Sequence, residues 1–318
     1  MSVHWNANKV IGGIQNPRFL IVGPELSPNV SFEEGLTGVS SPTSAATQLF
    51  DATTPFLDYV LKVEDDSATL FERADITVDA GETVANKRFI VFGYARNHNS
   101  GQHAFRTMFK DTSNGKDLVA NEEWRRIIVH EHIFDGDTNG NSFTYQIFPA
   151  WDLTTNTGAV RVDEFRVRKV LAEYELPLPE RGSQTQVFRI VKQAEHELIN
   201  KAIKTYKAGF RYYYEASYDR LTPGQELIRA QLAMTDNEIL FFPHKDSWDC
   251  YLVKWADDLE RKWAFGTAAH GHAGDVQLIS QEILHIIPTE IFDALQQYEY
   301  PEEEFIVESS QESIIIHI

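Results

Sequence analysis

The sequence has little cysteine, few basic residues for its number of acids, and no long apolar run. Cys250 is the only cysteine in 318 residues, so no intrachain disulfide can form, as expected for folding in a reducing cytoplasm. Lys and Arg total 29 against 47 Asp and Glu, a net charge of −18. This balance argues against binding to nucleic-acid phosphates or to an anionic membrane surface. No run approaches a membrane span, and the first residues lack a signal-peptide pattern, so we expect neither in the chain.

Catalytic motifs are also lacking. The sequence contains no Gly-x-Ser-x-Gly elbow, phosphate-binding loop or dinucleotide fingerprint. His196-Glu197-Leu198-Ile199-Asn200 has Asn where a metalloprotease motif needs its second His. Nothing singles out one acid pair among 47 acids, and a solvated charged surface is the default. We therefore expect a protein that is not an enzyme.

The first half of the chain has the pattern of short β-strands. Its apolar segments are rich in β-branched and aromatic residues, and Gly, Asn and Asp punctuate them. The predicted strands are 59–63, 87–94, 124–129, 143–148 and 160–167. Many short strands with few helical stretches predict a β-sandwich or barrel.

The second half is mainly β with one or two short helices. Two prolines and a glycine in Leu176 to Gly182 suggest a linker. We therefore predict domains at 1–171 and 184–318, joined by residues 172–183. Thr222 and Pro223 predict a helix start, as N-cap and first helical residue, and a second short helix is expected over 288–297. Strands are predicted at 208–218, 238–242, 250–255, 262–265 and 276–286, with an isoleucine-rich run at 313–318.

The N-terminal half resembles jelly-roll carbohydrate-binding modules that accompany xylanases. The resemblance covers roughly residues 20–170 and rests on short motifs: Asn29-Val30-Ser31-Phe32-Glu33-Glu34-Gly35, Ile76 to Thr83, Phe89 to Ala95, Glu123-Trp124-Arg125-Arg126, and Val162-Asp163-Glu164-Phe165. Val39 stands where that family usually has Trp. The resemblance implies a jelly-roll β-sandwich and a glycan as the ligand class.

The C-terminal half resembles distal-tail and tail-tube-like proteins of long-tailed phages. Three segments in order carry this resemblance: Tyr206 to Tyr214, Leu221 to Leu227, and Ile239 to His244. The resemblance implies a tail-type β domain that forms rings around the tail axis. It also implies a location in the virion tail after assembly in the host cytoplasm.

A turn-like segment carries the pattern of half a calcium loop. Asp135, Asp137 and Asn139 place oxygen ligands at alternate positions, and Gly140 permits a sharp turn. The twelfth position is Gln146 and not the bidentate Glu, so an acidic hairpin turn is the alternative. Calcium is the one cofactor that the sequence suggests. The pair His130 and His132 lacks enough partners for zinc, and strand or loop histidines are the preferred interpretation.

Three aromatic residues are candidates for stacking on sugar rings: Trp151, Tyr94 and Trp124. Sugar C–H faces pack against aromatic rings, and Tyr and Trp add a polar group. The alternative is burial in the core, which the resembling modules imply for Trp124 in particular.

These patterns together predict a structural protein of a phage tail or baseplate. The C-terminal domain would form or dock on a ring with itself and other tail proteins. The sandwich would face outward, as a decoration or a weak reader of host-surface glycans. The alternative is a secreted glycan-binding accessory module of a polysaccharide-degrading system.

Overall fold

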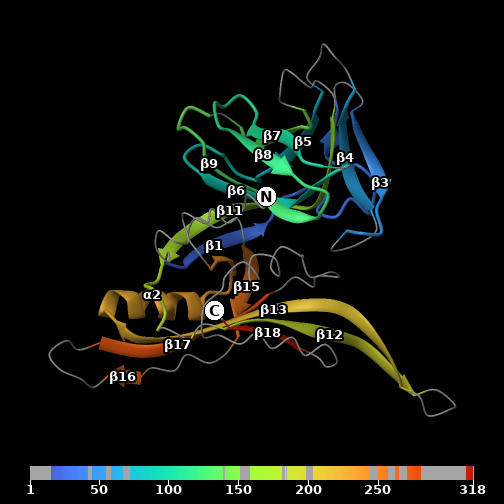
Figure 1. Cartoon of the computed structure of the whole chain (residues 1–318). Helices are drawn as coiled ribbons and strands as arrows, with labels where there is room; N and C mark the ends of the chain where they lie inside the picture. The colour runs from blue at the N-terminus through green and yellow to red at the C-terminus, as the bar shows by residue number, and fades with distance from the viewer. Residues whose placement is uncertain are drawn as a thin grey trace. The chain divides into compact units, whose positions relative to one another are not determined.

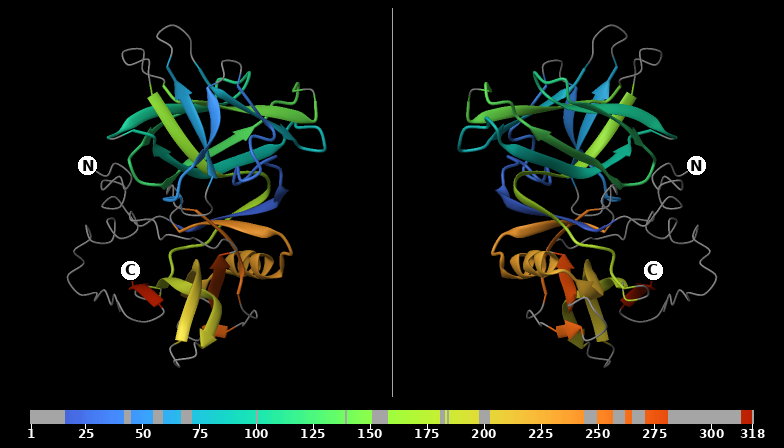
Figure 2. Two further views of the ribbon diagram at one scale, coloured as in Figure 1. Left: turned by 90° about the vertical axis from the view of Figure 1, so that its right-hand side faces the viewer. Right: turned by 90° about the vertical axis from the view of Figure 1, so that its left-hand side faces the viewer.

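A computed structural model defines the fold, and it confirms the mainly β prediction. It describes residues 16–41, 45–54, 59–66, 72–99, 101–138, 140–150, 158–180, 183, 185–197, 203–243, 250–256, 262–264, 271–280 and 313–317. By internal contacts the chain forms two compact units, one of residues 23–171 and one that combines residues 1–22 with most of 172–318. Figures 1 and 2 show the strands of each unit.

The first unit is a two-layer β-sandwich of the predicted jelly-roll type. One sheet runs in the order β3 (Ala46–Phe50), β4 (Tyr59–Asp65), β11 (Gly158–Glu175), β6 (Arg88–Asn97) and β9 (Arg125–Ile133). The other runs β2 (Val39–Ser40), β5 (Ala74–Asp79), β10 (Ser142–Phe148), β7 (His103–Phe109) and β8 (Gly115–Ala120). All these pairings are antiparallel.

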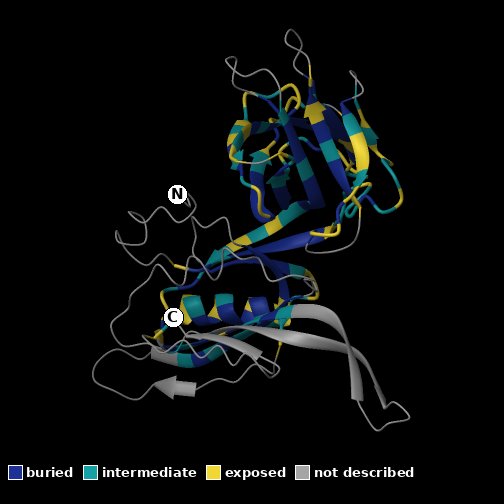
Figure 3. Cartoon of the chain, turned by 45° about the vertical axis from the view of Figure 1, so that its right-hand side comes forward, coloured by how far each residue is buried: buried dark blue, intermediate teal, exposed yellow. Residues whose placement is uncertain are grey.

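Aromatic side chains fill the space between the two sheets. Phe89 of β6 meets Phe143 of β10 with ring centroids 5.0 Å apart, and Tyr145 of β10 lies 5.5 Å from Phe165 of β11. Phe109 of β7 joins the same cluster, 5.0 Å from Tyr145. Figure 3 shows the buried positions that run along these strands. Each fully buried ring contributes about 1.5 to 3 kcal/mol of transfer free energy, so this cluster holds the layers together.

The second unit contains one antiparallel sheet, and a helix packs on it. Its strands follow the order β18 (Ser313–His317), β12 (Thr185–Glu197), β13 (Ile203–Leu221), β17 (Gly271–Ser280), β15 (Tyr251–Trp255), β14 (Glu238–Phe242) and β1 (Arg18–Glu25). β16 (Lys262–Ala264) pairs with β17. Arg18 to Val22, which we assigned by sequence to the sandwich, pair here with β14. Separable domains with a junction at 172–183 stay a prediction, as does the tail-tube-like identity of this unit.

One helix, α2 (Pro223–Met234), packs on this sheet and begins where the sequence predicts. Thr222 is the N-cap and forms a capping box with Gln225, and Pro223 takes the first helical position. Arg229 of the helix is buried and donates to Glu226 at 2.8 Å and to the Asp275 carbonyl of β17 at 2.9 Å. These bonds attach the helix to the sheet. The second predicted helix, over 288–297, lies outside the described residues.

The isoleucine-rich run pairs within its own chain. β18 lies antiparallel to β12, with Thr185 opposite His317 and Arg189 opposite Ser313. The run therefore adds a strand to the sheet of its own unit. In the part of the chain that the structure describes, no helix is long and apolar enough to cross a membrane.

Candidate binding site on the sandwich

Two of the three predicted stacking residues, Tyr94 and Trp124, do not present free ring faces. Tyr94 is 3% exposed, and the guanidinium of Arg126 lies 4.7 Å from its ring centroid. Trp124 is 7% exposed, and Arg96 lies 5.9 Å from its ring centroid. Because a guanidinium covers each ring, a stacking role does not fit Tyr94 or Trp124, and burial in the core describes both. Trp151 lies outside the described residues.

The calcium-like segment forms an exposed turn between β9 and β10. Asp135 and Asp137 are exposed, and the Thr138 amide donates to the Asp135 carbonyl at 3.1 Å. Gly140 has a φ of 118°, a left-handed conformation that favours glycine, as the sequence pattern requires. Asn139 lies outside the described residues, and within the described ranges no cluster of three or more His, Cys, Asp or Glu could hold a metal ion. Calcium binding at this turn stays a prediction.

The histidines of β9 face the sandwich interior. His130 is 4% exposed, lies edge-on to Phe109 and has its Nδ1 atom 3.2 Å from the Tyr145 hydroxyl. The His132 ring stacks against the Phe109 ring, with the ring centroids 4.9 Å apart. Burial lowers the pKa of His130 to about 3, with Lys116 adding to the effect, so the ring is neutral. A core role therefore accounts for both histidines.

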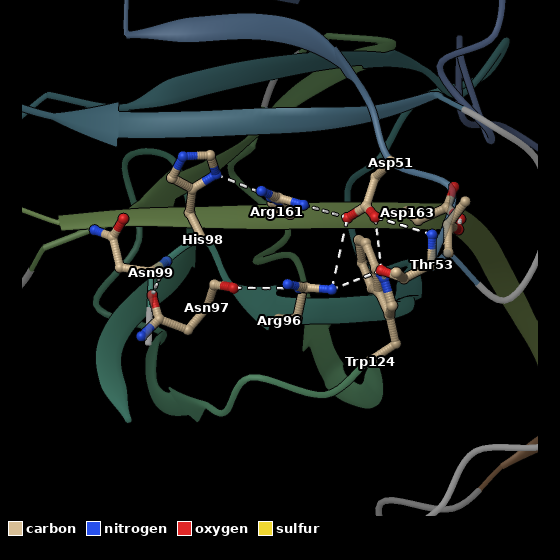
Figure 4. A network of polar contacts seen from close by, with 10 residues as sticks. Asp51, Thr53, Arg96, Asn97, His98, Asn99, Trp124, Arg161 and Asp163 are labelled. Atoms are coloured by element: carbon tan, nitrogen blue, oxygen red, sulfur yellow. Dashed lines mark hydrogen bonds and ion pairs between the residues drawn. The ribbon is translucent and has the colours of Figure 1, made fainter. Parts of the chain in front are cut away.

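A polar cluster joins three segments on the sheet that carries β11 and β6 (Figure 4). Arg96 and Arg161 are direct cross-strand partners on these two strands, so both side chains lie on one face. Asp51 follows β3 and lies between them: its Oδ2 atom accepts from Arg161 Nη1 at 2.5 Å and lies 3.8 Å from Arg96 Nη1. Arg96 also donates to the Thr53 hydroxyl at 2.6 Å, and Arg161 Nε lies 2.9 Å from Nδ1 of His98. We call these five residues the arginine cluster.

The guanidinium groups of Arg96 and Arg161 make the arginine cluster a positively charged site. Burial by itself would raise the pKa of Asp51, but hydrogen bonds from Thr53 and Arg161 outweigh it and lower the pKa. Burial and then the cations Lys62, Arg161 and Arg96 lower the pKa of His98. Burial is also the largest cause that lowers the pKa of Arg96, and the charge of Arg161 adds to it. Two guanidinium groups therefore share one carboxylate, beside an imidazole whose charged form is disfavoured by burial and by the neighbouring cations.

A buried carboxyl group lies next to this cluster. Asp163 is 0% exposed, accepts from the amide of Glu164 at 2.7 Å and is hydrogen-bonded to the hydroxyl of Thr54. Burial raises the pKa of Asp163 to about 8, and the nearby charge of Glu164 adds to this, so the group is mainly protonated at neutral pH.

A β-bulge in β11 places Asp163. The register against β6 shifts between Asp163 and Arg166, and Glu164 has a φ of 48°. Gly93 of β6 faces this bulge, and a Cβ atom there would lie only 3.2 Å from the Glu164 carbonyl. The glycine therefore lets the two strands approach at the point where one of them bulges.

The sequence analysis missed the arginine cluster because its members are common residue types far apart in the chain. Asp51, Arg96 and Arg161 share no motif, and only strand pairing brings them together. One signal was present: Arg161 interrupts the apolar positions Val160 and Val162, so it lies on the opposite face of its strand. The bulge also had a signal, because Val160 and Val162 are followed by Phe165 and Val167, a break of one residue in the alternation.

Comparisons with known proteins give weak structural similarities. No family model matches the chain, and no curated protein matches it. Among solved structures, the CBM22-1 xylan-binding domain of Paenibacillus barcinonensis Xyn10C is 17% identical, with 48% of this chain and 98% of that chain covered and a TM-score of 0.35. The CBM22-1–CBM22-2 tandem of the same protein is 12% identical, with 86% of each chain covered and a TM-score of 0.36. An arabinose-bound MgGH51 α-L-arabinofuranosidase is 11% identical, with 50% and 27% covered and a TM-score of 0.35. At these identities and TM-scores the similarities establish no ligand or activity for this chain.

Proposed function

We propose that the chain is a non-catalytic structural protein of a tailed-phage tail or baseplate, and that its sandwich binds a glycan of the host surface. The C-terminal unit would form or dock on a ring, and the protein would be assembled in the host cytoplasm. The resemblance of residues 206–244 to distal-tail and tail-tube-like sequences supports the assembly role. The two-layer sandwich of residues 23–171 supports the binding role.

The arginine cluster is the observation that carries the binding proposal. Sugar hydroxyls are bound by planar polar side chains that are fixed in place, and the guanidinium groups of Arg96 and Arg161 are held by Asp51 while 19% and 16% of each side chain stays exposed. Thr53 is exposed beside them. The cluster thus combines rigid donors with access from solvent.

An exposed aromatic pair lies next to the cluster in sequence. Phe50 of β3, one residue before Asp51, is 57% exposed, and its cross-strand partner Tyr59 is 38% exposed. Their ring centroids are 5.7 Å apart in an edge-to-face arrangement. Exposed rings can stack on sugar C–H faces, which the buried rings of Tyr94 and Trp124 cannot do. We propose Phe50 and Tyr59 as stacking residues of a separate contact, because the strand register places Tyr59 on the face of β4 that carries Leu61 and Val63, opposite to the face of Lys62 and Arg161.

Binding of the purified full chain to a broad glycan array tests this proposal. We expect binding to at least one glycan, and Arg161→Ala and Phe50→Ala should each weaken it by about tenfold. Arg106→Ala is the matched control, because Arg106 pairs with Asp117 on the other sheet, in an exposed ion pair at 2.5 Å. No binding to any glycan, or equal loss with Arg106→Ala, would remove the binding role.

Self-assembly separates the phage role from the rival accessory-module role, which shares the glycan binding. Light scattering coupled to size exclusion should show a ring-sized oligomer of the full chain, or capture of tail proteins that form a ring. A persistent monomer that binds glycan and no tail protein would favour the accessory module. Incubation with a panel of polysaccharides should give no hydrolysis, and turnover abolished by one carboxylate substitution would disprove the non-catalytic part.

A further inference from the structure

The arginine cluster has more positive charge than its own residues neutralise. Two guanidinium groups meet a single carboxylate, Asp51, whose Oδ2 atom serves both. Lys62, which faces Arg161 from β4, is already paired with Glu64 at 2.6 Å. In direct contacts the two guanidinium groups therefore share one negative charge, and Glu122 acts on Arg96 only at longer range, in a chain whose net charge is −18.

The two guanidinium groups also keep unused donors. Arg96 uses Nε toward the Asn97 carbonyl and Nη1 toward Thr53, while Arg161 uses Nε toward His98 and Nη1 toward Asp51. Among the described residues, the Nη2 atom of each arginine has no hydrogen-bond or ion-pair partner. A guanidinium group has five N–H donors in a planar fork, so each can still bind an oxygen of a ligand.

We propose that the arginine cluster recognises an acidic sugar, whose carboxylate or sulfate oxygens bind the free Nη2 donors of Arg96 and Arg161. This inference rests on the proposed glycan-binding function and names its ligand class. The planar fork matches the paired oxygens of a carboxylate, and a sulfate ester offers the same pairing. The lowered pKa of His98 agrees with the proposal: burial is its largest cause, and the charges of Lys62, Arg161 and Arg96 add to it.

The negative net charge of the chain affects which glycans can bind at the arginine cluster. An anionic glycan is repelled by an acidic protein at long range, so only a local cationic site can hold it. Asp51 competes with the ligand for both guanidinium groups. Removing its charge should therefore strengthen binding to an acidic sugar. The Asp51 side chain is only 4% exposed, so it is not itself a contact for a sugar hydroxyl.

Paired ligands that differ only in charge test the proposal on the full chain. The probes are oligogalacturonate with its neutral methyl ester, a sialoside with its asialo form, and carrageenan oligosaccharides with agarose oligosaccharides. We expect at least one charged member to bind about tenfold or more tighter than its neutral partner. The preference for uronate, sialoside or sulfated probes then identifies the acidic group. Raising the salt concentration should reduce this difference.

Three variants connect the binding to the cluster. Arg96→Lys keeps the charge but loses the fork, and should weaken acidic-glycan binding by about fivefold or more. Asp51→Asn should strengthen it by about threefold. Arg106→Gln on the other sheet should change nothing, and thermal melting confirms that each variant is folded.

The outcomes separate this inference from the proposed function. Binding to neutral glycans only, or weaker binding in folded Asp51→Asn, would overturn the acidic-sugar inference and leave the glycan-binding function standing. Absence of binding to every probe and to the wider array would overturn both.

Discussion

Asp163 should make the sandwich less stable as the pH rises. Its pKa is raised from an ordinary 3.8 to about 8 in the folded chain, so the folded state binds a proton that the unfolded state releases. The stability from this neutral buried group is complete below about pH 4 and is lost as the pH rises toward and through 8. One pKa unit corresponds to about 1.36 kcal/mol, so the loss has an upper bound of about 6 kcal/mol.

Asp163→Asn should remove this pH dependence. An amide has the shape of the neutral acid: its oxygen can accept from the Glu164 amide, and its NH₂ group can donate to the Thr54 hydroxyl, which can turn to accept. The variant should be closest to the wild type in stability at pH 5, where at most about 1.6 kcal/mol of the contribution of Asp163 has been lost. At pH 9 it should be more stable than the wild type by at least about 2 kcal/mol.

Urea unfolding at pH 5, 7 and 9 measures this difference. The comparison of variant with wild type cancels groups that titrate equally in both proteins. Asp117→Asn, at an exposed carboxylate paired with Arg106, is the control and should show a difference that does not grow between pH 5 and 9. If Asp163→Asn is less stable than the wild type at pH 9, the carboxyl group is ionised in the folded state and the argument about its burial is wrong.

Four further predictions follow from single features. The pKa of His130 is lowered to about 3, so between pH 6.5 and 4 only the unfolded state takes up a proton at this residue. The free energy of unfolding should therefore fall by about 3 kcal/mol over this range. Urea unfolding should show this loss in the wild type and little of it in His130→Phe. Gly274→Ala should destabilise the second unit by at least about 2 kcal/mol, because a Cβ atom there would overlap the Arg229 guanidinium. Gly224→Ala is the control: its Cβ atom would lie in open space at the helix start, so the variant should be neutral or slightly stabilising in the same assay. Deleting residues 313–318 should lower the melting temperature of the second unit, because β18 pairs with β12; a truncated chain of unchanged stability that no longer assembles would instead place this strand between subunits. If calcium binds at Asp135, Asp137 and Asn139, chelation should lower the melting temperature of the sandwich alone, and an unchanged value would leave an ordinary turn.

The strand pattern was readable from the sequence because burial alternates along these strands. The predicted 143–148 is β10, with buried Phe143, Tyr145 and Ile147 on one face, and the predicted 238–242 is β14 with identical bounds. The helix start at Thr222 was readable because capping is local chemistry. The place of Arg18 to Val22 was not readable, since their pairing with β14 joins residues more than 200 positions apart in the sequence.

The binding residues were harder to predict because an aromatic residue in a strand has the same local pattern whether it is buried or exposed. Tyr94 and Trp124 were reasonable candidates, but Arg126 and Arg96 cover their rings. Among the residues that the structure describes, the exposed aromatic rings are Phe50 and Tyr59, in strands where neither residue stands out. Exposure depends on which strand lies at a sheet edge, and β3 is an edge strand of this sheet.

The covering arginines connect the failed stacking prediction with the acidic-sugar proposal. A guanidinium group placed over a buried ring has apolar contacts on one side, and its N–H donors need partners at the edges of its plane. The Arg96 guanidinium donates to the Asn97 carbonyl and to the Thr53 hydroxyl, and it lies near the Asp51 carboxylate without a hydrogen bond to it. The neighbouring Asp163 adds no negative charge near neutral pH, because its burial keeps it protonated. Arg96 therefore covers the Trp124 ring, which removes that stacking surface, while the edge of the Arg96 guanidinium stays accessible. At such an edge a ligand is selected by its charge and its paired oxygens more than by its ring faces.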